Sequence, residues 1–204
     1  RWFQEARYGM FIHWGPYAAI GRGEQVLFRD HMDPVQYEKA ACLWNPREFD
    51  AKRLARIARE AGMKYACLTT RHHDGYCLWD SDLTDYTSMK QAPGRDFVRE
   101  YVDAFRAEGL RIGLYYSWLD WRVPAFFDGP EKNPEGFKAM KAYIHGQIEE
   151  LLTRYGQIDH FFFDGSWPRT YEELGSAELV AKMRRWQPGI LINNRLGKSE
   201  TKSV

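Results

Sequence analysis

Five short apolar runs, separated by segments with helical periodicity, constrain the fold more than any other feature of this 204-residue chain. Each run ends in polar residues, and the runs cover residues 8–12, 64–70, 111–117, 158–163 and 189–194. Near-continuous apolar runs of this length are typical of parallel strands that are buried on both faces. The pattern therefore predicts a parallel sheet built from strand–helix–strand units.

The segments between these runs carry the start and stop signals of helices. Asp50 and Asp96 each stand at the N-cap of an apolar pattern with helical spacing, and a glycine ends both patterns. Asn133 is a third N-cap, followed by Pro134 at the first helical position. With a shorter pattern after Ser176, the sequence predicts helices over 50–62, 96–109, 133–156 and 176–188.

Polar residues at the ends of several strands favour a barrel over an open nucleotide-binding sheet. No GxGxxG motif follows the first run, and the chain has no Walker A motif. Barrel enzymes gather their chemistry at the carboxyl ends of many strands. We therefore expect an α/β fold of the (β/α)8, TIM-like barrel type. A full barrel has eight strands and takes about 250 residues. Because only five strands are predicted here, we expect a partial barrel in this chain.

Charge and hydropathy exclude two broad classes of protein. The chain carries 29 Lys and Arg against 28 Asp and Glu, whereas a nucleic-acid-binding protein usually has a clear basic excess. No apolar stretch approaches the roughly 20 residues that span a bilayer. The three cysteines have neither the spacing of a metal site nor that of a disulfide framework. We therefore expect no nucleic-acid partner and no membrane span.

The predicted strand ends bring hydrogen-bonding groups and flat aromatic rings to one edge of the sheet. Hydroxyl groups need paired donors and acceptors, while aromatic rings cover the apolar face of a sugar. The mixture therefore indicates a pocket for a compact polyhydroxylated ligand. Its candidate residues are His13, Trp14, His72, His73, Asp74, Tyr115 or Tyr116, Asp164, Trp167 and Arg195, with Glu24 from the long loop after the first strand.

Asp164 admits two interpretations. It follows three phenylalanines at the end of a strand, where an unpaired carboxylate costs several kcal/mol. Such a carboxylate is hydrogen-bonded or serves a function. The alternative is a turn or helix-capping aspartate, because Gly165 follows it directly.

A metal site is a second open possibility. His13, His72, His73, Asp74 and Asp164 are residue types that metal-dependent barrel hydrolases use as ligands. Against this, the chain has no His-x-His on the first strand. Adjacent histidines on a regular strand also point to opposite faces.

Four short blocks together resemble a known family. Residues 11–15 (FIHWG), 71–76 (RHHDGY), 114–117 (LYYS) and 163–165 (FDG) are similar, in order and spacing, to the signature blocks of glycoside hydrolase family 29, the α-L-fucosidases. The resemblance implies a (β/α)8-like catalytic domain that is usually followed by a β-sandwich. It also implies hydrolysis of terminal α-L-fucose with retention of configuration, without a metal or other cofactor.

The resemblance assigns roles residue by residue. Asp164 matches the catalytic nucleophile, and Glu200 is the candidate acid/base unless that residue lies beyond Val204. The residues that match sugar-binding positions are His13, Glu24, His72, His73, Tyr115 (with Tyr116 as the competing assignment), Phe162 and Arg195. Gln25 and Phe162 each stand where the family often has tryptophan. A phenyl ring at 162 still covers the methyl face of fucose.

These expectations leave two alternatives open: a metal-dependent barrel hydrolase, and a fucose-binding relative without catalysis. Residues 1–204 are expected to form the N-terminal portion of the catalytic domain, without the β-sandwich. The expected partner is a fucosylated oligosaccharide or glycoconjugate. The resemblance favours a periplasmic, secreted or lysosomal compartment, and the sequence carries no signal for oligomeric state or fucosyl linkage.

Overall fold

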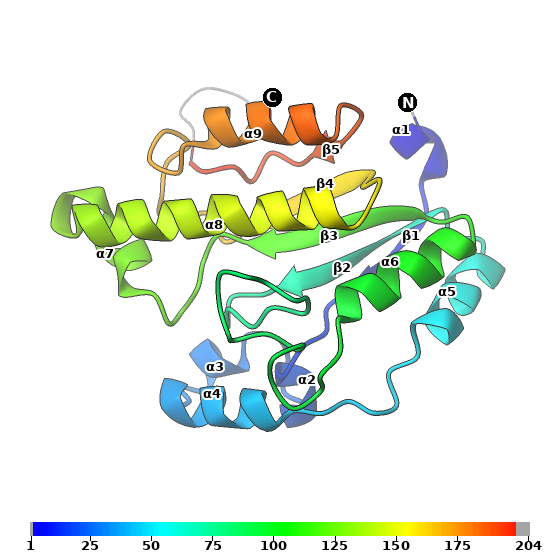
Figure 1. The fold of residues 1–204 in the computed structure, drawn as a ribbon, viewed down its shortest axis with the longest axis horizontal. Helices are drawn as coiled ribbons and strands as arrows, with labels where there is room; N and C mark the ends of the chain where they lie inside the picture. The colour runs from blue at the N-terminus through cyan, green and yellow to red at the C-terminus, as the bar shows by residue number, and fades with distance from the viewer. Residues whose placement is uncertain (1, 199–204) are drawn as a thin grey trace.

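The computed structural model describes residues 2–198, which contain a five-stranded parallel sheet (Figure 1). Strands adjacent in the chain are also adjacent in the sheet, and every pair is parallel. An open dinucleotide-binding sheet reverses its strand order at a switch point, whereas a barrel keeps the order of the chain. The strands are β1 (Gly9–Ile12), β2 (Tyr65–Arg71), β3 (Arg111–Ser117), β4 (His160–Asp164) and β5 (Leu191–Ile192).

The four predicted helices are confirmed, and each connects two neighbouring strands. The side chains of Asp50, Asp96 and Asn133 accept hydrogen bonds from backbone amides three residues ahead. Ser176 differs from the prediction because Gly175 is the N-cap and Ser176 is the first helical residue. The connecting helices are α5 (Ala51–Glu60), α6 (Phe97–Ala107), α8 (Pro134–Arg154) and α9 (Ser176–Trp186).

Five further helices lie in segments for which the sequence predicted none. Most of them are too short to show a helical period, since four or five residues make little more than one turn. In Figure 1, α2, α3 and α4 lie beyond the arrowhead of β2, and α7 lies beyond that of β3. These helices are α1 (Trp2–Ala6), α2 (Tyr17–Ile20), α3 (Val26–Arg29), α4 (Pro34–Leu43) and α7 (Pro124–Lys132).

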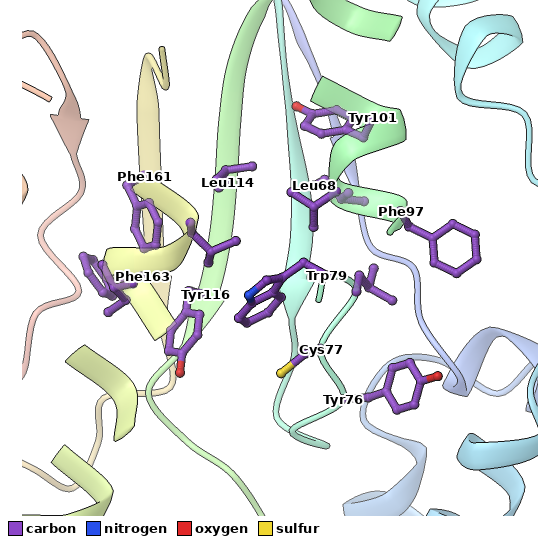
Figure 2. Packing of buried hydrophobic residues seen from close by; sticks show 14 of the residues in the cluster. Leu68, Tyr76, Cys77, Trp79, Phe97, Tyr101, Leu114, Tyr116, Phe161 and Phe163 are labelled. Atoms are coloured by element: carbon purple, nitrogen blue, oxygen red, sulfur yellow. The ribbon is translucent and has the colours of Figure 1, made fainter. Parts of the chain in front are cut away.

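The sheet buries one face under the connecting helices. Along β4, Phe161 and Phe163 are fully buried, whereas Phe162 and Asp164 are only partly buried. Figure 2 shows Phe161 and Phe163 beside apolar side chains of β3, within a buried cluster that also includes side chains of β2. Because successive side chains point to opposite faces of a strand, Phe162 and Asp164 share the other face.

That second face is concave. The rings of Phe11 in β1 and Phe162 in β4 lie 5.2 Å apart between centroids, although two strands separate them. In a flat sheet, β1 and β4 would lie roughly 14 Å apart, with parallel side chains that do not meet. The sheet is therefore curled, as in a (β/α)8 barrel, and the described residues supply five of its strands.

The fifth strand is shorter than predicted. Within the predicted run over 189–194, Leu191 and Ile192 pair with β4, and the backbone N–H of Asn193 donates to Phe161 O at 3.3 Å. Asn193 continues the pairing with its side chain, since Phe163 N donates to Asn193 Oδ1 and Asn193 Nδ2 donates to Phe163 O, both at 2.9 Å. A side-chain amide here replaces the backbone hydrogen bonds.

No helix within residues 2–198 is long and apolar enough to cross a membrane.

Candidate active site

Asp164, the last residue of β4, carries a carboxylate on the concave face that accepts two side-chain hydrogen bonds. Its Oδ1 accepts a hydrogen bond from Arg195 Nη1 at 2.6 Å, and its Oδ2 accepts one from Tyr115 OH at 3.0 Å. The side chain is 16% exposed. Two donors compensate for partial burial and orient the carboxylate. Asp164 is thus a hydrogen-bonded carboxylate at the carboxyl end of the sheet, and no helix begins directly after it.

The two tyrosines of β3 point to opposite faces of the sheet. Tyr115 points to the concave face and donates to Asp164, whereas the Tyr116 hydroxyl donates to Gln147 Oε1 of α8 at 2.7 Å. Adjacent side chains on a strand point to opposite faces, so only one of the two can reach the site. Tyr115 is that residue.

Three histidine rings line the same end of the sheet. His13 follows β1, while His72 and His73 follow β2, which ends at Arg71. The ring centroids of His72 and His73 lie 4.1 Å apart, and those of His13 and His72 lie 5.6 Å apart. The prediction that these adjacent histidines diverge is therefore wrong, since their rings lie side by side. Both lie in the turn beyond the strand, where the strand alternation no longer applies.

Burial keeps these histidines neutral. It lowers the pKa of His72 to about 2 and the pKa of His73 to about 4. Burial also lowers the pKa of His13, and the negative charges of Glu24 and Asp164 oppose that shift. The charge of Glu24 also raises the pKa of His73, so this loop residue lies within electrostatic range of the histidines. Neutral imidazoles offer one donor and one acceptor each, which suits hydroxyl groups.

Phe162 and Arg195 complete the concave face. The Phe162 ring stacks on Tyr115 with 5.8 Å between centroids, and the Arg195 guanidinium lies 5.4 Å from the Phe162 ring centre. Arg195 thereby touches both the aromatic surface and the carboxylate. Trp167, three residues beyond Asp164, is 60% exposed, and its ring lies 6.3 Å from that of His73. All the predicted sugar-binding residues in the described part of the chain thus lie at one end of the sheet.

Two candidates from the sequence lie elsewhere. Trp14 points away from the site and stacks on Phe49 at 4.3 Å, because it fills the space between the sheet and the loop before α5. Asp74 is fully buried, where it accepts hydrogen bonds from Tyr37 OH at 2.6 Å and from Tyr76 N at 3.3 Å. It therefore shapes the turn after β2. Glu200, the candidate acid/base, lies outside the described residues.

Within residues 2–198, no three His, Cys, Asp or Glu side chains are grouped as the ligands of a metal ion would be. The structure adds one residue that the sequence argument missed. Ser117 Oγ lies 2.6 Å from His73 Nδ1, at the carboxyl end of β3. Its signals in the sequence were its place at the end of an apolar run and its place in the LYYS block.

The chain that carries this site is similar to known proteins in both sequence and structure. The Alpha-L-fucosidase family model matches residues 1–203. Tissue alpha-L-fucosidase of Homo sapiens is 32% identical over 223 residues, covering 97% of this chain and 47% of that protein. Alpha-L-fucosidase isoenzyme 1 from Paenibacillus thiaminolyticus has a similar structure, with a TM-score of 0.90 and 47% identity over 98% of this chain and 50% of its own.

A further similar structure is a glycoside hydrolase family 29 α-L-fucosidase from Bacteroides thetaiotaomicron, described as a trapped covalent intermediate in complex with 2-fluoro-fucosyl fluoride. It is 34% identical with a TM-score of 0.87, over 96% of this chain and 48% of its own. The chain spans about half the length of the curated relatives that it matches. Because the family match runs from residue 1 to residue 203, the chain belongs to the α-L-fucosidase family.

Proposed function

We propose that the protein hydrolyses terminal α-L-fucose from glycans with retention of configuration, and that Asp164 is its nucleophile. One observation carries the proposal. In a chain of the α-L-fucosidase family, a carboxylate at the end of β4 is held by Tyr115 and Arg195 and faces neutral histidines. Residues 1–204 are then the N-terminal portion of the catalytic barrel, and the substrate is a fucosylated oligosaccharide or glycoconjugate.

The proposed reaction needs two carboxyl groups about 5–5.5 Å apart, as in other retaining glycosidases. Asp164 attacks the anomeric carbon as a carboxylate, and a covalent glycosyl-aspartate forms while the leaving group departs. A second carboxyl group protonates the leaving group and then takes a proton from water. The family member trapped as a covalent intermediate supports this order of steps. Glu200 remains the proposed acid/base of this chain, with a residue beyond Val204 as the alternative.

His13, His72, His73 and Glu24 are proposed to bind the hydroxyl groups of fucose. The neutral histidines supply donors and acceptors without a net charge, and the Phe162 ring covers the apolar methyl face. This division of polar and apolar contacts is what a deoxy sugar requires.

Hydrolysis of para-nitrophenyl α-L-fucoside, with and without EDTA, tests the proposal on the protein with its natural ends. Fucose release that survives EDTA is the expected result. Saturable fucose binding without release would instead identify a binding relative. Release that EDTA abolishes would favour a metal-dependent hydrolase, and the absence of both binding and release would refute the proposal.

Tyr115→Phe and Tyr116→Phe form a matched pair of variants. Tyr115→Phe removes the hydrogen bond to Asp164, and we expect kcat to fall by about 10- to 100-fold. Tyr116→Phe removes a hydroxyl from the opposite face of the same strand and leaves kcat unchanged, while unfolding becomes easier by about 1 kcal/mol. Steady-state kinetics and urea unfolding measure the two effects. Equal kinetic losses in both variants would contradict the assignment of Tyr115.

Stability is expected to rise with pH between about pH 4 and pH 6.5, the range between the pKa of folded His73 and that of an unfolded histidine. Unfolded His72 and His73 bind protons in this range, whereas the folded residues do not. Each histidine therefore adds up to about 1.4 kcal/mol to the free energy of unfolding for each pH unit in this range. Its full contribution is reached above about pH 6.5. Urea unfolding across this range gives the dependence of the free energy of unfolding on pH. In His72→Gln this slope should be smaller, by the amount that corresponds to about one bound proton. An unchanged slope would contradict the burial of His72 as a neutral ring.

A further inference from the structure

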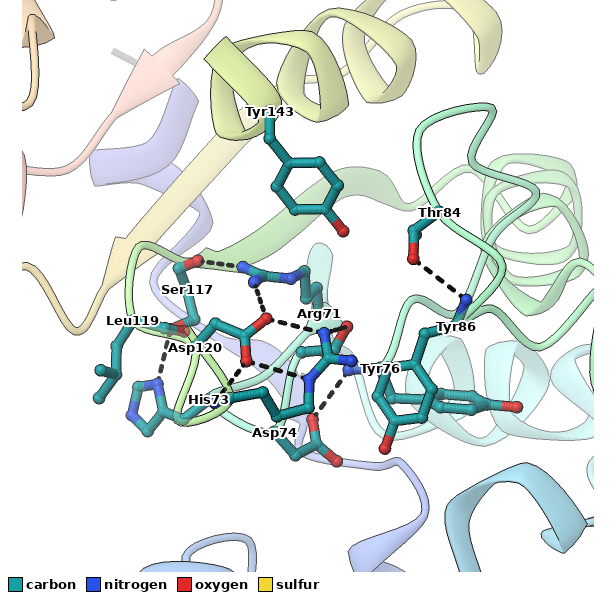
Figure 3. Close-up of polar contacts among 12 residues, drawn as sticks. Arg71, His73, Asp74, Tyr76, Thr84, Tyr86, Ser117, Leu119, Asp120 and Tyr143 are labelled. Atoms are coloured by element: carbon teal, nitrogen blue, oxygen red, sulfur yellow. Dashed lines mark hydrogen bonds and ion pairs between the residues drawn. The ribbon is translucent and has the colours of Figure 1, made fainter. Parts of the chain in front are cut away.

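The hydroxyl of Ser117 makes two hydrogen bonds with only one proton. Ser117 is fully buried, and its Oγ lies 2.7 Å from the carbonyl oxygen of Leu119 and 2.6 Å from His73 Nδ1 (Figure 3). A carbonyl oxygen only accepts, so the Ser117 proton points to Leu119. The remaining partner, His73 Nδ1, must then donate its own proton to Ser117 Oγ.

This direction decides which nitrogen of His73 carries the proton. A neutral imidazole has one N–H, so a proton on Nδ1 leaves Nε2 with a free lone pair. Nε2 lies 3.9 Å from Asp164 Oδ2, which is also an acceptor. Two acceptors therefore face the same space, and a group bound between them must bring a donor.

The surroundings of His73 hold its ring in this orientation. Trp121 N donates to His73 O at 2.9 Å, which anchors the backbone. Gly165 has a φ of +65°, and a Cβ there would lie 2.9 Å from His73 Cε1. The ring is thus packed from the side of the β4 turn. Turning it over would replace Nδ1 with a carbon and leave Ser117 Oγ without a donor.

We propose that Ser117 is a positioning residue that fixes His73 as its Nδ1–H tautomer, so that Nε2 accepts a hydrogen bond from a hydroxyl of the bound sugar. The inference deepens the proposed function and rests on it for the identity of the ligand. It specifies the direction of one contact, in which the sugar hydroxyl is the donor. An O-methylated sugar at that position therefore loses the contact, because it has no proton to donate.

The tautomer can be observed without any activity. Long-range ¹H–¹⁵N correlation spectra of the ¹⁵N-labelled protein with its natural ends, near neutral pH, distinguish the two tautomers of each histidine. The signal of His73 is the one lost in His73→Gln. We expect the Nδ1–H form in the unmodified protein, and a shift toward Nε2–H in Ser117→Ala. A wild-type His73 in the Nε2–H form would overturn the proposal, even if Ser117→Ala fails to fold.

Ser88→Ala is the matched control. Ser88 is also fully buried, but its hydroxyl donates to the Arg95 carbonyl at 2.7 Å rather than bonding to His73. It should leave the His73 spectrum unchanged. An Nδ1–H form that persists unaltered in a folded Ser117→Ala would overturn the role of Ser117.

Kinetics with the aryl fucoside provide the second arm. Ser117→Ala should lower kcat/KM by about 10- to 100-fold, the range found for residues that orient a ligating histidine. Ser117→Thr, which keeps the hydroxyl, should recover most of this loss, whereas Ser88→Ala should have no effect. Equal losses in Ser117→Ala and Ser117→Thr would point to packing and contradict the proposal. If no variant hydrolyses the fucoside, the proposed function fails while the tautomer remains decided by the spectra.

Discussion

Asp164→Asn and Asp164→Gly are expected to abolish hydrolysis of an aryl α-L-fucoside, with kcat reduced on the order of 10⁴-fold or more. An amide or a hydrogen atom cannot form the glycosyl ester, and no other described carboxylate is bonded to both Tyr115 and Arg195. The glycine variant also leaves space where the carboxylate lay. Added azide should then enter that space and attack the anomeric carbon directly, which restores release of an activated leaving group.

The product of that rescue is diagnostic. A single displacement by azide inverts the configuration, so a β-fucosyl azide identifies Asp164 as the nucleophile of a double displacement. Asp85→Asn serves as the control, because the Asp85 side chain is 91% exposed and lies on a loop. Steady-state kinetics and NMR of the products measure both effects. Substantial turnover by Asp164→Asn would remove this residue as the nucleophile.

Asp120→Ala should lower the free energy of unfolding by about 3–5 kcal/mol. Asp120 is buried and accepts from Arg71 Nη2 at 2.6 Å and from Arg122 Nη2 at 2.9 Å, as Figure 3 shows. Burial would raise the pKa of Asp120, but the two arginines outweigh it and hold that pKa below the ordinary value. Loss of the carboxylate leaves the Arg71 guanidinium charged and uncompensated inside the protein.

Urea unfolding near neutral pH measures this loss. Glu108→Ala is the matched control, because it breaks the Arg59–Glu108 pair of 2.8 Å, in which the Arg59 side chain is 68% exposed. An exposed pair of this kind is screened by water and stabilises a protein far less than a buried one, so the control should unfold much like the unmodified protein. A loss below about 1 kcal/mol in Asp120→Ala would contradict the argument that the buried pair is essential to this turn.

The same cluster connects stability to the site. Arg71 Nη1 donates to the carbonyl oxygen of Ser117 at 2.8 Å, directly where the Ser117 hydroxyl meets His73. The segment that carries the site after β3 is therefore tied to β2 by a buried charge. Nothing in the spacing of Arg71 and Asp120 predicted this pair, since 48 residues separate them in the chain.

The elements with a strong local signal were predicted correctly. The helices that begin after Asp50, Asp96 and Asn133 are confirmed because an N-cap bonds to amides of its own helix, so its effect is local. The four longer strands were recognised from their apolar runs, although only β2 and β3 are buried on both faces as the pattern predicted. The short fifth strand was overestimated, since an Asn193 side chain takes over the pairing that the pattern assigned to backbone.

The sequence by itself determined the order of the strands and of the four helices that connect them, and it identified Asp164 and the histidines as strand-end groups. Only the tertiary structure decided which neighbours serve the site: Tyr115 rather than Tyr116, His72 together with His73, and Ser117 behind them. Hydrophobic periodicity and helix caps depend on residues within a few positions of each other, so they can be recognised from the sequence alone. The direction of a side chain at a strand end depends on where the strand stops and on contacts with distant segments, which exist only after the sheet has curled.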